Sequence, residues 1–560
     1  MRHLFFLLIF FILQPVASAQ TGWQKTFDHG AVSSADQLAS EVGKQILMQG
    51  GNAVDAAIAV QFALAVTLPR AGNIGGGGFM VVRLADGTVN TLDFREKAPL
   101  SASRDMYIKE GEYQSRLSKD GALAVGVPGT VDGMVQAHQK YGTMEWKSLI
   151  EPAIKLAENG YSLSYSQAAG LNAHLDRFRN YTGASVYFLP KNDSLFSEGD
   201  LFVQKDLAQT LTFIADLGRD GFYAGEVADE IVNEMNNLGG IITHEDLNKY
   251  ESVWRAPVTV DFRGYKLYLM PPPSSGSVAI AQILKMMEPY PLEEMGFGSA
   301  DYLHVMAESM RRAFADRSFY LGDPDFWEVP ISELTSVEYN SERMNSFSMD
   351  SVTPSETLSH GDVPGYQEST ETTHFSIIDR DGNAVGITTT LNGSFGSHVA
   401  VTGAGFLLNN EMDDFSAQPG VPNMFGLLGG EANSIQPEKR MLSSMIPMIA
   451  TKDGKVVMVI GAAGGPRIIT AVLQNFLNMA VFEMDAQQAN AAPRIHHQWM
   501  PDILFYDRLT LSPDTIRLLE AKGHKLRPSS VARIHSLMIT EDGKIGAGVD
   551  PRGDGYAAGF

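Results

Sequence analysis

Two adjacent threonines, Thr372 and Thr373, stand where a polar segment gives way to an alternating, strand-like pattern. The preceding residues 341–371 are rich in Ser, Thr, Pro and Gly, a composition that buries too little apolar surface to order itself firmly. A threonine hydroxyl is a weak nucleophile and needs an adjacent base. Cleavage before Thr372 would give that residue a free α-amine of pKa about 7.7–8.0, which accepts the hydroxyl proton at neutral pH. The segment therefore predicts an N-terminal nucleophile produced by a cut in the chain.

The residues after the threonines predict a hairpin. The strand-like stretches TTHFSIID and AVGITTTLN flank the Asp-Gly pair at 381–382, which is a strong turn signal. If that pair forms a two-residue turn, Thr372 lies opposite Leu391, with Thr390 and Asn392 as near neighbours, and a slip of one position would change the partner. A second hydroxyl and a carboxamide would then lie close to the nucleophile. The alternative, ordinary threonines at the start of a strand, stays open here because threonine is common in strands.

Composition narrows the possible chemistry. The chain has 560 residues, 44 % of them hydrophobic, a formal net charge of −22 and no cysteine. The acidic balance argues against nucleic-acid binding and against adhesion to anionic membranes. The lack of cysteine excludes thiol catalysis, disulfide chemistry and thiolate metal sites. For His496 and His497 we favour packing over metal binding, because neighbours in a strand point to opposite faces and no acid-rich ligand set surrounds them. We expect no metal and no cofactor.

The first residues have the pattern of an export signal. Residues 1–19 combine a short basic start, an apolar run at 4–13 and a small-residue cleavage site at 17–19. The apolar run is too short for a comfortable membrane span, and no later stretch approaches 18 apolar residues. We expect a soluble mature chain from Gln20 that is periplasmic or secreted.

Hydrophobic periodicity and turn residues predict the elements that must position the threonines. A glycine run at 75–78 leads into a strand and lacks the Lys-Ser/Thr ending of a phosphate loop, which favours close backbone packing. The predicted elements are helices within 35–66, mainly helices over 130–250, helices within 277–320, and strand-rich segments at 78–94, 254–270, 372–392 and 446–461.

Ten short motifs follow one another along the chain: GGNAVDAAIA, GNIGGGGFM, DFREKAP, GVPGTVDG, PPPSSGS, TTHFSIID, LLNNEMDDFS, KRMLSSMIP, GAAGGPRI and GVDPRGDG. In this order they resemble the γ-glutamyltransferase (γ-glutamyltranspeptidase) family of N-terminal-nucleophile hydrolases, over about residues 28–560. Any one of them would be a weak signal, whereas ten in family order are very specific. The resemblance implies an α+β fold, a four-layer αββα sandwich of the N-terminal-nucleophile hydrolase type.

The resemblance also implies a role for each matching residue. Autocleavage would break the Glu371–Thr372 bond and give a large subunit, 20–371, with a flexible tail at 341–371, and a small subunit, 372–560, with a lid-type loop at 419–442. The two subunits would associate as one structural domain. The implied catalytic residues are Thr372, Thr390, Gly464 and Gly465. The implied substrate-binding residues are Arg95, Asn392, Glu411, Asp414, Ser443 and Ser444.

The residue types suit a γ-glutamyl donor, whose amino-acid end is a zwitterion. One Arg with two hydroxyls, Arg95 with Ser443 and Ser444, matches its α-carboxylate through charge-assisted hydrogen bonds. Two acids and an amide match its ammonium. Adjacent glycines let backbone N–H groups approach a developing oxyanion. The chain departs from some members by having Glu411 in place of Gln, and Phe425 in place of a lid tyrosine; for the phenylalanine we hypothesise apolar packing of the ring.

The implied activity is that of a γ-glutamyltransferase and glutathione hydrolase, with glutathione and related γ-glutamyl compounds as donors and water, an amino acid or a dipeptide as acceptor. Two alternatives remain at this point. One is a glutaryl or cephalosporin acylase of the same family, whose donor lacks the α-amine. The other is an exported binding protein that uses the zwitterion pocket without cleavage.

Overall fold

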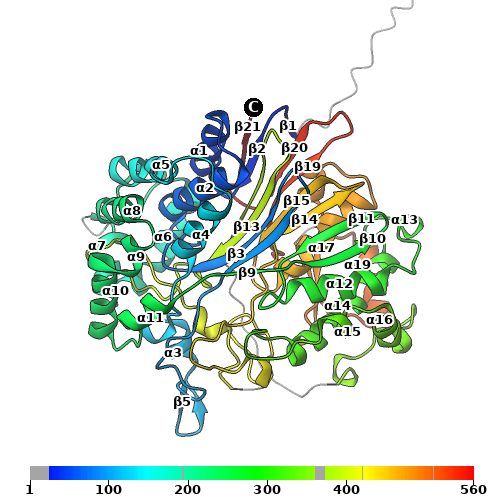
Figure 1. Ribbon diagram of the computed structural model, residues 1–560. Coiled ribbons are helices and arrows are strands. Elements are labelled where there is room, and N and C mark those ends of the chain that lie inside the picture. The colour runs from blue at the N-terminus through cyan, green and yellow to red at the C-terminus, as the bar shows by residue number, and fades with distance from the viewer. Residues whose placement is uncertain (1–23, 192–193, 360–371, 419, 509) are drawn as a thin grey trace, which may run out of the picture.

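The computed structural model of the chain describes residues 24–191, 194–359, 372–418, 420–508 and 510–560. Two seven-stranded sheets lie face to face at its centre, and helices cover the outer face of each (Figure 1). Every strand pairing within these two sheets is antiparallel. The arrangement confirms the predicted α+β, four-layer αββα sandwich.

The sheet that carries the threonines is called the nucleophile sheet. Its order is β21 (Tyr556–Gly559), β2 (Ala31–Ser34), β12 (Thr373–Ile378), β13 (Ala384–Thr390), β3 (Gly77–Arg83), β4 (Val89–Phe94) and β9 (Val253–Arg255). The second sheet has the order β1 (Lys25–Phe27), β20 (Ile545–Val549), β19 (Arg533–Ile539), β15 (Lys455–Ala463), β14 (Met448–Lys452), β11 (Tyr265–Leu269) and β10 (Val258–Phe262). Each sheet therefore mixes strands from before and after Thr372.

Alternation of side chains along the strands divides the core into two parts. On β3, Met80 and Val82 pack with the helices of the first layer, whereas Phe79 and Val81 pack with residues of the second sheet.

The first helix layer consists of α1 (Gln37–Met48), α2 (Ala53–Thr67), α4 (Thr130–Tyr141), α5 (Trp146–Asn159), α6 (Tyr165–Phe178), α7 (Thr182–Phe188), α8 (Lys205–Leu217), α9 (Asp220–Tyr223), α10 (Gly225–Leu238) and α11 (His244–Lys249). The layer beyond the second sheet includes α12 (Gly276–Met287), α14 (Ala300–Tyr320), α17 (Arg467–Ala480), α18 (Ala486–Ala491) and α19 (Pro513–Ala521).

Local signals explain most of these elements. Asn52 caps α2 through its side chain, and Asp55 returns a hydrogen bond to the cap, which completes a capping box. The hairpin of β10 and β11 turns at Arg263 and Gly264, which both have positive φ as a tight two-residue turn requires. The glycine run before β3 is packed as predicted. A Cβ on Gly76 would lie 2.1 Å from the carbonyl oxygen of Thr390.

The predicted register of the nucleophile hairpin is wrong by one position. Thr373 pairs with Thr389, and the same register places Thr372 opposite Thr390 rather than Leu391. The turn is longer than a two-residue Asp-Gly turn because Asp379 organises it. The Asp379 carboxylate accepts from the backbone N–H groups of residues 381 and 383, at 3.0 and 2.9 Å. The observed register places the two hydroxyl-bearing residues, Thr372 and Thr390, opposite each other across the ladder.

Part of the segment predicted to be a flexible tail, residues 341–371, is packed against the rest of the protein. Residues 344–358 contain short 3-10 turns and lie against the body of the protein, where Trp499 donates to the carbonyl oxygen of Ser355 at 2.9 Å. Ser355 is almost fully buried. Polar composition was misleading there because buried arginines of α14 supply hydrogen bonds to this stretch. Residues 360–371 lie outside the described part of the chain, as do residues 1–19 of the predicted export signal.

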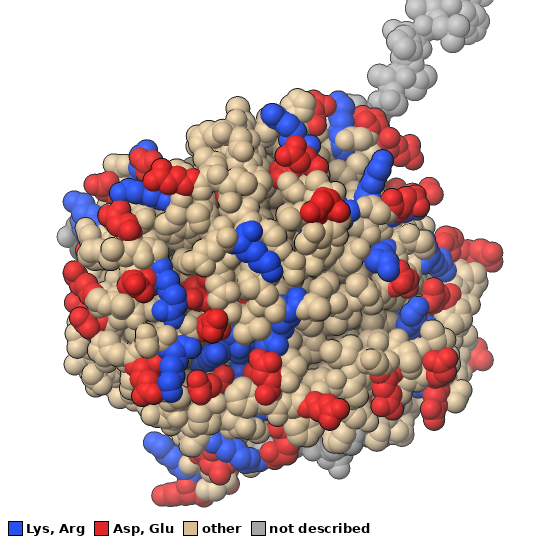
Figure 2. Space-filling model, in the orientation of Figure 1, with Lys and Arg blue, Asp and Glu red and all other residues tan. Residues whose placement is uncertain are grey.

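The surface carries both signs of charge. Acidic and basic side chains are interspersed over the face seen in Figure 2, despite the net charge of −22. Within the described residues, no helix combines the length and the apolar character needed to cross a bilayer.

Candidate active site

The candidate nucleophile lies at the start of β12, on the face between the two sheets. Thr372 shares this face with His374 and Ser376, and the Ser376 hydroxyl donates to carbonyl groups of β15 and β19 in the second sheet. Thr372 is 7 % exposed and therefore almost shielded from solvent. Burial lowers the pKa of His374 well below its ordinary value, and its ring bonds only to Thr388 and Ser376 among the described residues. His374 is therefore a neutral packing residue and not the general base.

Thr390 is oriented by the end of its own strand. The backbone N–H of Asn392 donates to Thr390 Oγ1 at 2.7 Å, where Asn392 adopts a positive φ of 73°. One acceptor site of the hydroxyl is thereby occupied, and Thr372 lies opposite Thr390 across the ladder. The Asn392 side chain donates to the carbonyl oxygen of Asn410 at 3.0 Å, which leaves its carboxamide oxygen as the group suited to accept from an ammonium.

A small, largely enclosed pocket gathers the predicted site. Of the ten predicted catalytic and binding residues, all except Gly464 line it, and Gly464 directly precedes a lining residue. The full lining is Arg95, Arg317, Thr372, Thr390, Asn392, Glu411, Asp414, Phe425, Leu427, Ser443, Ser444, Met445, Gly465 and Ile468. Glu371, the other residue of the predicted cleavage site, lies outside the described residues.

One end of the pocket concentrates negative charge around a single cation. Arg95 forms ion pairs with Glu411 and with Asp414, the latter at 2.5 Å, and lies 3.6 Å from Glu96. Burial raises the pKa of Asp414 to about 6, that of Glu96 to about 7 and that of Glu411 well above its ordinary value, although Arg95 opposes each shift. Three carboxyl groups against one guanidinium give an environment that favours a further positive charge, such as an ammonium.

The structure places Arg95 with the acids and not with the serines. Among the described residues, its hydrogen-bond partners do not include the hydroxyl of Ser443 or of Ser444. Those two hydroxyls instead accept hydrogen bonds from the backbone N–H of Met445, at 3.1 Å, and from Arg317, at 3.3 Å. Arg317 was not predicted from the sequence. The motif PPPSSGS was the sequence signal nearest to Arg317. Ser275 of this motif accepts from Arg317 and donates to the carbonyl oxygen of Ser443.

The glycine pair lies directly before helix α17. Gly464 has φ of +147° and Gly465 of +54°, backbone conformations that side-chain-bearing residues rarely adopt. A helix N-terminus presents unsatisfied N–H groups and a partial positive charge, which stabilise a nearby anion. The pair therefore has the position and the open backbone that an oxyanion-binding site needs.

The lid-type loop covers this glycine pair with an apolar ring. Phe425 is 4 % exposed, and its Cδ1 lies 2.8 Å from where a Cβ on Gly465 would be. Gln498 holds the loop by donating to the carbonyl oxygens of Phe425 and Gly426 at 3.3 and 3.2 Å. Asn423 of the same loop donates to Asp414 at 3.3 Å. The hypothesis that the ring acts by apolar packing agrees with these contacts.

The paired histidines have structural partners. His496 bonds to the Thr470 hydroxyl at 2.9 Å, and His497 to the Asp502 carboxylate at 3.2 Å. Both rings are buried, as the packing interpretation predicted. In the described part of the chain, no cluster of three His, Cys, Asp or Glu residues is arranged to hold a metal ion.

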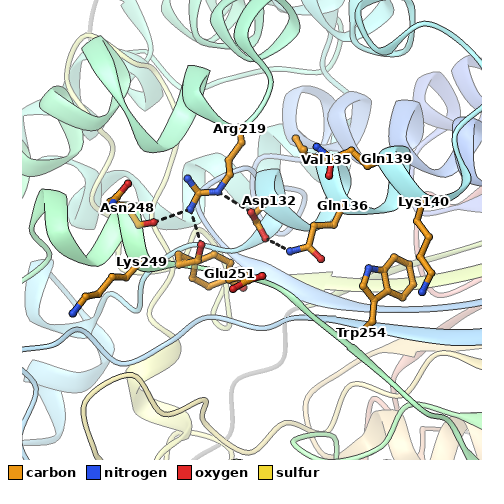
Figure 3. Close-up of a pocket in the computed structure, with 11 residues that line it drawn as sticks. Asp132, Val135, Gln136, Gln139, Lys140, Arg219, Asn248, Lys249, Glu251 and Trp254 are labelled. Atoms are coloured by element: carbon orange, nitrogen blue, oxygen red, sulfur yellow. Dashed lines mark hydrogen bonds and ion pairs between the residues drawn. The ribbon is translucent and has the colours of Figure 1, made fainter.

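A wider groove of about 780 Å³ lies apart from this pocket, between α4, the end of α11 and β9 (Figure 3). Its central Arg219 is already engaged by Asp132, at 2.9 Å, and by backbone carbonyls including that of Tyr250, at 2.6 Å. Lys140 lies over the Trp254 ring. The groove shares no lining residue with the pocket of Thr372, and its polar groups are largely satisfied by one another.

Comparison with known proteins confirms the family resemblance of the motifs. The model of the family described as Gamma-glutamyltranspeptidase matches residues 39–560. A relative named glutathione hydrolase proenzyme, from Escherichia coli K12, is 46 % identical over 535 residues, which cover 95 % of this chain and 92 % of that protein.

Two solved structures have a backbone similar to that of this chain. A cephalosporin acylase from Bacillus halodurans superposes with a TM-score of 0.87 at 27 % identity and covers 99 % of both chains. A gamma-glutamyltranspeptidase from Helicobacter pylori has a TM-score of 0.58 at 50 % identity, over 59 % of this chain and 94 % of that one. The fold is thus shared by both kinds of relative, and the side chains of the pocket must discriminate between their donors.

Proposed function

Because the chain belongs to the gamma-glutamyltranspeptidase family, we propose that Thr372 is the nucleophile with which it acts. The protein is an enzyme, a γ-glutamyltransferase and glutathione hydrolase. The observation that carries the assignment of residues is the pocket itself, which brings Thr372 opposite Thr390 and beside a group of buried acids.

We propose that maturation is an intramolecular cut. The Thr372 hydroxyl attacks the carbonyl carbon of Glu371, the C–N bond breaks, and the amine of Thr372 leaves as a new chain end; water then releases the carboxylate of Glu371. Residues 20–371 and 372–560 stay together, because both central sheets pair strands from the two fragments. The new amine is then placed on the residue that must lose a proton during catalysis.

Catalysis follows with the same hydroxyl. Its oxygen attacks the γ-amide carbonyl of the donor while the α-amine of Thr372 takes the hydroxyl proton. The backbone N–H groups at Gly464 and Gly465 stabilise the oxyanion, and the amine of the leaving group receives the proton as the amide bond breaks. A γ-glutamyl ester on Thr372 remains. Water resolves it to glutamate, and the amino group of an amino acid or dipeptide resolves it to a new γ-glutamyl amide.

Donor recognition uses two groups of pocket residues, the acids that surround Arg95 and the serines Ser443 and Ser444. The donor ammonium binds Glu411 and Asp414 with the carboxamide oxygen of Asn392. As the ammonium takes over these acids, the guanidinium of Arg95 becomes available to the α-carboxylate, which the hydroxyls of Ser443 and Ser444 also bind. Charge is conserved in this exchange, so a zwitterion replaces internal ion pairs without leaving a buried charge alone.

A glutaryl or cephalosporin acylase is the second candidate, favoured by the backbone similarity to the acylase structure. The charge distribution argues against it. A glutaryl donor brings a carboxylate but no ammonium, and it would leave Glu411, Asp414 and Glu96 to share the single charge of Arg95. The exported binding-protein alternative is excluded by the enzyme assignment.

The test is p-nitroaniline release from L-γ-glutamyl-p-nitroanilide, measured with and without glycylglycine. We expect release by the purified enzyme and faster release with the dipeptide, which accepts the γ-glutamyl group. A denaturing gel of the same sample should show two bands, of about 38 and about 20 kDa in proportion to 60.9 kDa for 560 residues. Release from the glutaryl anilide in preference to the γ-glutamyl anilide would instead support the acylase.

We expect kcat/KM for the γ-glutamyl anilide to fall with decreasing pH in two steps. The α-amine of Thr372 must be unprotonated, and a chain-end amine has a pKa of about 7.7–8.0. Asp414 must be ionised to bind the ammonium, and burial raises its pKa to about 6. Protonation of either group removes function, so the slope of log kcat/KM against pH should approach 1 between about pH 6 and the amine pKa of about 7.7–8.0, and 2 below about pH 6.

The control for this profile is Asp414→Asn, which cannot take up the second proton. Its residual activity should lack the steepening near about pH 6 that protonation of Asp414 produces. A slope of 1 throughout in the unaltered enzyme would show that Asp414 does not titrate in donor binding.

We also propose an exported protein, periplasmic or secreted, from the signal-like pattern of residues 1–19. Glutathione and other γ-glutamyl compounds are its proposed small-molecule partners.

A further inference from the structure

The second cation of the pocket, Arg317, has a setting unlike that of Arg95. It projects from α14, is 4 % exposed and lines the pocket together with Thr372. Its guanidinium donates to two hydroxyls: Nε donates to Ser275 Oγ at 2.9 Å, and Nη2 donates to Ser444 Oγ at 3.3 Å. Among the described residues, none contributes a carboxylate in an ion pair with it.

The partners of Arg317 determine which way the serine hydroxyls can donate. Ser275 accepts from Arg317 and donates onward to the carbonyl oxygen of Ser443 at 2.7 Å. Ser444 Oγ accepts from Arg317, and Ser443 Oγ accepts from the backbone N–H of Met445. With an acceptor site of each pocket hydroxyl already used, the O–H groups of Ser443 and Ser444 are available as donors. Two hydroxyl donors side by side suit a carboxylate.

The charge of Arg317 favours the same ligand. A buried cation without a carboxylate partner is costly unless a ligand supplies the opposite charge. Burial lowers the pKa of Arg317 to about 10, so it remains protonated at neutral pH. Arg95 already faces three carboxyl groups at the other end of the pocket. Asp414 attracts Arg317 from beyond ion-pair distance, and among the described residues no carboxylate forms an ion pair with it, so a ligand carboxylate at the two serines would be favoured.

We propose that Arg317 is a positioning residue for the α-carboxylate of the donor, acting through Ser444 and, by way of Ser275, through Ser443. This inference rests on the proposed function, since it assigns a further residue to donor binding at the same site. Arg317 orients the Ser444 hydroxyl directly, holds Ser275 against the backbone carbonyl of Ser443, and adds a positive charge that the carboxylate neutralises. It does not take part in attack on the amide, so its effect belongs to donor binding.

The experiment compares two donors in Arg317→Met, which removes the charge and both hydrogen bonds at similar side-chain length. L-γ-glutamyl-p-nitroanilide carries the α-carboxylate, and 4-aminobutanoyl-p-nitroanilide lacks it but keeps the amine. Acylation is followed in single turnover with enzyme in excess, because the second donor is expected to react slowly. We expect kcat/KM for the γ-glutamyl anilide to fall about 10- to 100-fold, mainly through KM, and less than about threefold for the other donor.

Two further variants keep the test decisive if Arg317→Met fails to mature. Arg317→Lys retains the charge but not the paired donors, and should lose about 3- to 10-fold with the γ-glutamyl anilide. Ser275→Ala removes only the relaying hydroxyl, because the backbone N–H of Ser275 still donates to the Ser443 carbonyl at 2.8 Å. It should show a loss of the same order, again confined to the donor with the carboxylate.

The matched control is Arg343→Met. Arg343, the last residue of α16 (Val337–Arg343), pairs at 3.0 Å with Asp316, which lies on α14 next to Arg317; Arg343 does not line the pocket. It should leave kcat/KM for both donors within about twofold. Equal losses for the two donors in the Arg317 and Ser275 variants would overturn the inference. If the unaltered enzyme releases no p-nitroaniline from the γ-glutamyl anilide, it is the proposed function that fails.

Discussion

Replacing Thr372 with alanine is expected to leave a single uncut chain with no measurable release of p-nitroaniline. The substitution removes the hydroxyl that attacks the carbonyl of residue 371 and later the donor amide, so both maturation and turnover are lost. Removing a catalytic nucleophile typically costs about 10⁴- to 10⁶-fold in kcat. The measurements are a denaturing gel and the anilide assay on the same preparation.

The matched control is Thr372→Ser, which keeps a hydroxyl and, after cleavage, an α-amine on the same residue. It should still give two bands, more slowly, and retain part of the activity. N-terminal sequencing of the small fragment should then read one serine followed by THFS, and TTHFS in the unaltered protein. Two bands from the alanine variant would show that another residue cuts the chain.

Neutralising Asp414 is expected to change which donor the enzyme prefers. In Asp414→Asn, the ammonium loses a buried carboxylate partner, and breaking a buried charge pair costs about 3–5 kcal/mol. We expect kcat/KM for L-γ-glutamyl-p-nitroanilide to fall about 10²- to 10³-fold. Glutaryl-p-nitroanilide, which has no ammonium, should change less than about threefold or react faster, because one repulsive carboxylate is gone.

Asp413→Asn controls for the loss of one buried charge at the neighbouring position. Asp413 accepts from the Met424 N–H at 2.7 Å and from the Tyr113 hydroxyl at 3.2 Å. It does not line the pocket. Its effect should be similar for the two donors, since it supports the lid loop and not the ammonium. Parallel losses for both donors in Asp414→Asn would contradict the assignment of this acid to the ammonium.

The charge arrangement also explains why one backbone serves two kinds of relative. The acylase structure and this chain superpose along their whole length, so the fold alone does not choose the donor. What distinguishes a γ-glutamyl from a glutaryl donor is one ammonium. Burial raises the pKa values of Glu411 and Asp414 even beside Arg95, so a further positive charge, such as that ammonium, would stabilise both carboxylates.

The sequence by itself determined the strands, their turns and the candidate residues. Period-two alternation and turn residues are local properties, so the hairpins at 78–94, 254–270 and 372–392 were predictable. The motifs predicted ten catalytic and binding residues, and all of them except Gly464 line the pocket. The sequence also indicated that Thr372 follows a polar segment.

Only the tertiary structure decided how these residues are paired. The Asp379 carboxylate lengthens the turn and so moves Thr372 opposite Thr390, a side-chain effect that alternation does not encode. Arg95 pairs with acids more than 300 residues later in the chain. Arg317 reaches the serines only because α14 packs against α12, the helix that begins directly after Ser275. Contacts between distant segments depend on how the layers pack, and no local pattern in the sequence specifies them.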